Sequence, residues 1–217
     1  MYKTVVFDLD GTLLNTLTDL ADAGNRLCRK YGWPTHERQA YRYFVGNGIP
    51  KLVERLAPAD QRTPAVLEAA LADFKRDYGQ HLRDTTAPYP GIPEMLAKLK
   101  ANGVQLAVFS NKADALAKEV VKDYFGTQYF TIVRGQMTGV APKAAAEGTN
   151  ALLQALHADP ASTLYVGDSN VDVETAHNAN LPCCGAVWGF RTREELNAAG
   201  AEYLAENSDE LYDVIMK

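Results

Sequence analysis

The amino-acid sequence predicts an α/β fold: a parallel sheet with helices on both faces, plus an inserted α-helical cap. Strand-like apolar runs alternate with helix-like segments over most of the chain. Parallel strands are usually joined by helices that cover the sheet in this way. The alternation stops once, over residues 16–87, where the segments have the apolar spacing of amphipathic helices. We therefore expect residues 1–15 and 88–217 to form the core domain and residues 16–87 the cap.

Four segments have the composition of buried strands. Residues 4–7 are mostly β-branched or aromatic, as core strands commonly are. Similar runs, each ending in polar residues, predict strands at 104–112, 162–172 and 183–189. In open parallel sheets ligands bind beyond the carboxyl ends of the strands, so the polar residues there predict a site.

Helices are expected between these strands and throughout the insertion. Apolar residues at intervals of three and four predict core helices at 93–103, 114–125 and 149–157. The same spacing predicts insertion helices at residues 19–32, 49–57 and 65–82.

Composition and charge exclude several classes of protein. The chain has 217 residues, 47% of them apolar, which suits one domain of ordinary size with an inserted subdomain. The formal net charge of −5 disfavours a nucleic-acid surface. Three cysteines without metal-ligand spacing indicate reduced thiols and a cytoplasmic protein. No signal peptide or membrane span is expected, and hence no membrane partner.

Two aspartates, a glycine and a threonine follow the first strand. Asp8 and Asp10 alternate with Leu9, so on an extended backbone both carboxylates point to the same side. Two carboxylates that close repel each other unless a cation or a shared proton offsets them. Gly11 supplies a tight turn, and Thr12 supplies a hydroxyl that can donate to a phosphate oxygen.

Polar residues also end two later strands. Ser110 and Asn111 end the second predicted strand, and Asp168 and Asp172 follow a later one. If these strands neighbour the first, their side chains meet in one crevice. Several carboxylates together suggest Mg²⁺, which commonly binds alongside phosphate oxygens. Lys143 is the candidate cation for the transferred phosphoryl group.

The aspartates after the first strand have two possible chemical tasks. An aspartate can act as nucleophile and form an aspartyl-phosphate. A neighbouring aspartate can protonate the leaving alkoxide and later deprotonate the attacking water.

These motifs resemble those of the haloacid dehalogenase (HAD) superfamily. Residues 8–12 are similar to its first motif, 110–112 to its second, Lys143 to its third and 167–172 to its fourth. The four motifs occur in the family's order. The resemblance implies a Rossmann-like core, a helical cap and Mg²⁺-dependent phosphatase activity. An acid at position 10 favours a phosphate monoester as the substrate.

The resemblance also implies a role for each matching residue. Asp8 would be the nucleophile and Asp10 the general acid/base. Asp8, the backbone carbonyl of Asp10, and Asp168 would hold Mg²⁺, with Asp172 in support. The phosphoryl group would be bound by Thr12, Ser110, Asn111 and Lys143.

Residues 43–56 resemble the cap segment of phosphoglycolate phosphatases. Gly46 and Gly48 flank Asn47, so the backbone can approach a ligand closely there. Lys51, one helical turn further on, is placed to bind a substrate carboxylate. Asn47, Gly48 and Lys51 are therefore candidate specificity residues, and phosphoglycolate is the first expected substrate.

The segment after Lys143 departs from the family, which usually has proline, any residue, proline there. Ala144 and Ala146 occupy the proline positions. Consecutive alanines favour helix, so the next helix is expected to begin early and carry Lys143 with it. A less firmly placed Lys143 would reduce turnover.

Two other functions are compatible with the same residues. A phosphomutase would pass the phosphoryl group back to a sugar. A non-catalytic phosphoacceptor or binding module would use the same aspartate and Mg²⁺, although receiver domains lack both the segment at residues 8–12 and a helical insertion. The expected partner is a small phosphorylated metabolite, and the chain is expected to be a monomer or homodimer.

Overall fold

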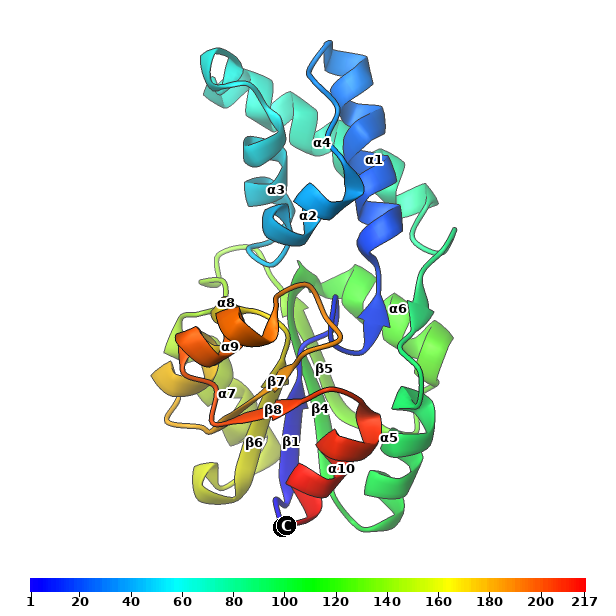
Figure 1. The fold of residues 1–217 in the computed structure, drawn as a ribbon. Coiled ribbons are helices and arrows are strands. Elements are labelled where there is room, and N and C mark those ends of the chain that lie inside the picture. Colours follow the sequence, from blue (N-terminus) through cyan, green and yellow to red (C-terminus); the bar gives the residue numbers. More distant parts are fainter.

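Figure 1 shows the protein in a computed structural model, which describes residues 1–217. A sheet with helices packed around it forms one part of the molecule, and a group of helices stands beyond one end of the sheet. The predicted α/β class is confirmed.

The main sheet has six strands in the order β5-β4-β1-β6-β7-β8, and every neighbouring pair is parallel. The strand bounds are β1 (Thr4–Phe7), β4 (Gln105–Ala113), β5 (Phe130–Gln136), β6 (Thr163–Gly167), β7 (Cys183–Ala186) and β8 (Tyr203–Ala205). β1 lies between β4 and β6, so the strands that carry the polar motifs are neighbours, as the site prediction required.

Two strands of the sheet were not predicted. β5 and β8 form its two edges, and most of their residues are only partly buried or exposed. Edge strands are covered less than central ones, so their sequences can carry polar residues and lack a continuous apolar run. The strands predicted at 162–172 and 183–189 are shorter than expected, because the chain turns at the site after Gly167 and Ala186.

Helices cover both faces of the sheet. Their bounds are α5 (Ile92–Ala101), α6 (Asp114–Phe125), α7 (Ala146–Leu156), α8 (Asn170–Asn178), α9 (Arg193–Ala199) and α10 (Ser208–Met216). Val5 and Phe7 pack in a buried cluster with residues of α5, α6 and α10, whereas Val6 packs in a second cluster with residues of α7, α8 and α9. Successive side chains of β1 therefore pack against the helices on opposite faces of the sheet.

The helical group contains α1 (Leu17–Tyr31), α2 (Arg38–Phe44), α3 (Ile49–Leu56) and α4 (Pro64–Gln80). Two short antiparallel strands, β2 (Leu14–Asn15) and β3 (Ala87–Pro88), pair where the chain leaves and re-enters the core. No helix of the structure has both the length and the apolar character required to cross a membrane.

The segment before α7 corrects one expectation. The helix does begin early, at Ala146, but Lys143 lies outside it in the preceding turn. The backbone N–H of Lys143 donates to Asn111 Oδ1 at 2.9 Å, which holds the residue beside β4. The prediction that the helix carries Lys143 is therefore wrong.

Candidate active site

Three carboxylates meet at the carboxyl end of the sheet. Asp8 directly follows β1, Asp168 follows β6, and Asp172 lies in the first turn of α8. One oxygen of each lies within 4.8 Å of the others. Asp172 is held in place because Ser169 donates to its Oδ2 from both its backbone N–H (3.1 Å) and its hydroxyl (2.7 Å). This cluster could hold a metal ion.

Gly11 allows the first motif to approach this cluster. Its φ of +92° lies in the region that favours glycine. A Cβ atom at this position would lie 2.3 Å from Asp168 Oδ2, which is inside the van der Waals distance. The motif therefore requires glycine both for its backbone conformation and for the room that Asp168 occupies.

Lys143 is the buried cation of the carboxylate cluster. Its Nζ donates to Asp8 Oδ1 at 2.7 Å and to Asp172 Oδ1 at 2.9 Å. Burial lowers the pKa of this lysine, but the carboxylates of Asp172 and Asp8 outweigh burial and raise the pKa well above its usual value. The structure thus brings Lys143 to the predicted nucleophile.

The carboxylates carry more negative charge than Lys143 offsets. Burial raises the pKa of Asp8 to about 7, and Asp172 and Asp10 add to that effect while Lys143 opposes it. Burial, followed by the charges of Asp172 and Asp8, also raises the pKa of Asp168. A site of this kind favours either protons or an added cation.

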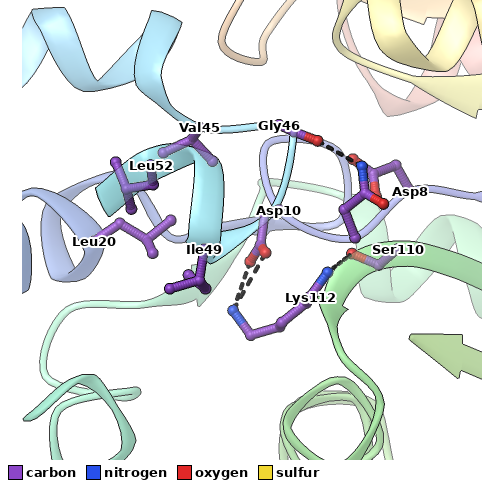
Figure 2. Close-up of a pocket in the computed structure, with 11 residues that line it drawn as sticks. Asp8, Asp10, Leu20, Val45, Gly46, Ile49, Leu52, Ser110 and Lys112 are labelled. Atoms are coloured by element: carbon purple, nitrogen blue, oxygen red, sulfur yellow. Dashed lines mark hydrogen bonds and ion pairs between the residues drawn. The ribbon is translucent and has the colours of Figure 1, made fainter. Parts of the chain in front are cut away.

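Asp10 points to a different partner. Its carboxylate oxygens lie 3.0 and 3.3 Å from Lys112 Nζ (Figure 2). The same ammonium donates to the hydroxyl of Tyr78, in helix α4, at 2.8 Å. Neither Lys112 nor Tyr78 was among the predicted site residues. The position of Lys112 in the second motif was the only local sign that it belongs to the site. Its residue type gave no such sign, because a lysine at the end of a strand is usually solvated.

A hollow that is partly open to solvent lies between the core and the helical group (Figure 2). Its core wall comprises Asp8, Asp10, Ser110, Asn111 and Lys112. Its other wall comprises Leu20, Val45, Gly46, Gly48, Ile49 and Leu52. The hollow therefore has one polar side and one largely apolar side.

Two predicted phosphate ligands have other partners in the structure. The hydroxyl of Thr12 is fully buried and donates to Asp168 Oδ1 at 3.0 Å, whereas the sequence predicts a bond to a phosphate oxygen. Asn111 Nδ2 donates to the Gly46 carbonyl at 2.8 Å, and its Oδ1 accepts from Lys143. Asn111 thus links the helical group to the loop that carries Lys143.

Of the predicted cap residues, only Gly48 borders the hollow that contains Asp8. Asn47 and Lys51 border a neighbouring hollow. Asn47 Oδ1 accepts from Arg55 at 2.9 Å, and Lys51 Nζ donates to Glu54 at 2.8 Å. The structure does not bring Asn47 or Lys51 to the carboxylates.

Comparisons with known proteins identify the family of the chain. The sequence profile of the haloacid dehalogenase-like hydrolases matches residues 5–186. A phosphoglycolate phosphatase from Chromobacterium violaceum is 31% identical, with 98% of this chain and 96% of that protein covered. One from Thiobacillus denitrificans is 32% identical, over 87% of this chain and 84% of that protein.

A solved structure shows the same fold over nearly the whole chain. It comes from Lactobacillus delbrueckii subsp. bulgaricus, and its name assigns that protein provisionally to the phosphoglycolate phosphatases. The TM-score is 0.93 at 28% identity, and the match covers 99% of this chain and 98% of that one. The chain therefore belongs to the haloacid dehalogenase-like hydrolase family, as a phosphatase similar to phosphoglycolate phosphatases.

Proposed function

We propose that this phosphatase hydrolyses a small phosphomonoester through an aspartyl-phosphate on Asp8, with Mg²⁺ as its metal and phosphoglycolate as the first expected substrate. The observation that carries the proposal is the convergence of Asp8, Asp168 and Asp172 within 4.8 Å, with Lys143 bonded to two of them. Asp10, two residues beyond the nucleophile, borders the same hollow.

The donor set fits a divalent cation. When ionised, the three carboxylates carry three negative charges, and the Lys143 ammonium offsets one. Hard oxygen ligands of this type suit Mg²⁺. Asp8, Asp168 and the backbone carbonyl of Asp10 would hold the ion, with Asp172 in support. Bound there, Mg²⁺ would supply positive charge to the oxygens of the phosphoryl group.

The protein's own residues perform the proposed proton and phosphoryl transfers. A carboxylate oxygen of Asp8 attacks phosphorus, and the bond from phosphorus to the ester oxygen breaks. Asp10 gives its proton to the departing alkoxide. A water then attacks phosphorus and gives its proton to Asp10, and the bond between phosphorus and Asp8 breaks to release phosphate. Ser110 and Lys143 would hold the phosphoryl oxygens through these steps.

The helical insertion would act as a cap over this reaction. Residues 16–87 supply the apolar wall of the hollow, through side chains such as Leu20, Ile49 and Leu52. An apolar cover excludes water from the reacting groups and restricts the size of the substrate. The names of the relatives support phosphoglycolate as the substrate.

Release of inorganic phosphate tests this function. The panel comprises phosphoglycolate, simple alkyl phosphates and sugar phosphates, each with Mg²⁺ and with EDTA. Asp8→Asn is the matched control, since it keeps the shape of the nucleophile and removes its charge. Mg²⁺-dependent release that the control abolishes would support the proposal. Release that persists in Asp8→Asn would refute the nucleophile, and sugar-phosphate isomerisation with little phosphate release would indicate a phosphomutase instead.

A further inference from the structure

Lys112 is a buried cation that the proposed steps do not use. Its side chain is 2% exposed, yet it borders the hollow that contains Asp8 and Asp10. It supplies the only cationic side chain in the lining of that hollow. Lys143 pairs with Asp8 and Asp172 and does not border this hollow, and Lys51 borders the neighbouring one.

The rest of the hollow offers no second cationic side chain for an anionic group, although Ser110 and Asn111 also line it. The wall from the helical group contributes four aliphatic side chains and two glycines. The core wall adds two carboxylates, which repel anions. A substrate that carries a second negative charge beside its phosphate therefore finds one side chain of opposite charge, that of Lys112.

The distances place Lys112 within reach of a short substrate. Its Nζ lies 3.0 Å from Asp10 Oδ1. To donate its proton, Asp10 must come within about 3 Å of the ester oxygen. The ester oxygen then lies at most about 6 Å from Lys112 Nζ when both contact Asp10. A carboxylate separated from the ester oxygen by one methylene group spans the remaining gap.

Tyr78 holds this ammonium from the helical group. Its hydroxyl accepts from Lys112 Nζ at 2.8 Å, and the centre of its ring lies 4.9 Å from the same nitrogen. Tyr78 is almost fully buried, so the contact is fixed by packing in helix α4. The helical group thus acts on the substrate pocket through a residue of the core strand β4.

We infer that Lys112 is a specificity-determining residue that binds a carboxylate one methylene from the phosphate ester, and that Tyr78 is its positioning residue. The inference rests on the proposed function and names the substrate feature that the site selects. The ammonium of Lys112 would contact both Asp10 and the substrate carboxylate. The lysine that selects the substrate is therefore also bonded to the proposed general acid/base. In this inference the substrate carboxylate is bound by Lys112 of the core, whereas the sequence predicts that Lys51 binds it.

The test compares phosphoglycolate with its amide, a neutral compound of the same shape. The quantity measured is the ratio of kcat/KM for phosphoglycolate to kcat/KM for the amide. If a variant disturbs Asp10, both values change by the same factor, and the ratio does not. A charge-assisted contact predicts that the wild type favours phosphoglycolate about 10- to 100-fold. In Lys112→Gln the ratio is expected to fall to about 1, mainly through a higher KM for phosphoglycolate. Tyr78→Phe should lower the ratio less, again through KM.

Two further lysine variants complete the design. Lys118→Gln, at an exposed position on helix α6, is the matched control and should keep the wild-type ratio. A ratio that Lys112→Gln leaves unchanged would overturn the inference, as would a loss of preference in Lys51→Gln alone. If Lys112→Gln does not fold, the other proteins still decide the inference. A wild-type preference for phosphoglycolate over its amide near 1 would overturn the inference, and a preference of 10 or more that is kept in Lys51→Gln would support it.

Failure of the proposed function gives a different result. If the wild type hydrolyses other esters with Mg²⁺ but shows no preference for the charged tail, hydrolysis stands and the inference fails. If it hydrolyses nothing, the proposed function fails. Calorimetry with Asp8→Asn then decides the inference, because equal Kd values for phosphoglycolate and its amide would overturn it and a tenfold difference would support it.

Discussion

Replacement of Lys143 by methionine is expected to destabilise the protein by about 3–5 kcal/mol, the usual cost of removing one partner from a buried ion pair. The substitution keeps most of the side-chain volume and removes the charge. It leaves Asp8 and Asp172 without the ammonium that now lies 2.7 and 2.9 Å from them. Because the lysine side chain is 2% exposed, water cannot replace it without a rearrangement.

Urea unfolding at pH 7.5 in EDTA measures this loss, since EDTA keeps a bound cation from offsetting it. The control is Lys118→Met, which removes an exposed lysine paired with Asp114 on helix α6. That control should cost less than about 1 kcal/mol. The view that Lys143 stabilises the carboxylate cluster would be refuted if Lys143→Met lowered the free energy of unfolding by less than about 1 kcal/mol, with the slope of that free energy against urea concentration unchanged.

Three other variants or probes test further contacts. Gly11→Ala should abolish activity and lower Tm, since its Cβ would lie 2.3 Å from Asp168 Oδ2; activity assays and thermal unfolding check this. Thr12→Val should weaken Mg²⁺ activation and leave inhibition by phosphate unchanged, because the hydroxyl contacts Asp168; titration with Mg²⁺ measures it. Burial raises the pKa of Cys28 to about 11 and of Cys184 to about 12, so these thiols should stay protonated and unreactive to a disulfide reagent at pH 8 until the protein unfolds.

Each of these predictions has its own contrary result. Gly103→Ala is the control for Gly11→Ala, because Gly103 also has a positive φ, +77°, but faces open space, so equal losses would refute the steric argument. Weaker inhibition of Thr12→Val by phosphate would indicate that the Thr12 hydroxyl binds the phosphate. Since burial raises the pKa of Cys28 in the folded protein above its ordinary value, the contribution of this thiol to stability is present below pH 9 and is lost as the pH rises towards 11. Rapid labelling of the folded protein at pH 8 would contradict this account.

The central strands and the first motif were predictable because their signals are local. Residues 4–7 form an apolar run that ends in Asp8 and Asp10, and such a run in a parallel sheet directs its carboxyl end towards the ligand. The edge strands β5 and β8 were missed because they carry less of the apolar pattern from which buried strands are recognised.

The sequence by itself determined the fold class and the acidic residues that meet at the end of the sheet, because periodicity and motif spacing are properties of neighbouring residues. Only the tertiary structure decided how the charges pair. Lys112 contacts Asp10 and Tyr78, which are 102 and 34 residues away from it, whereas Lys51 pairs with Glu54 in its own helix. The physical reason is that burial and the choice of partner depend on which helices and strands pack together, and no local pattern records that packing.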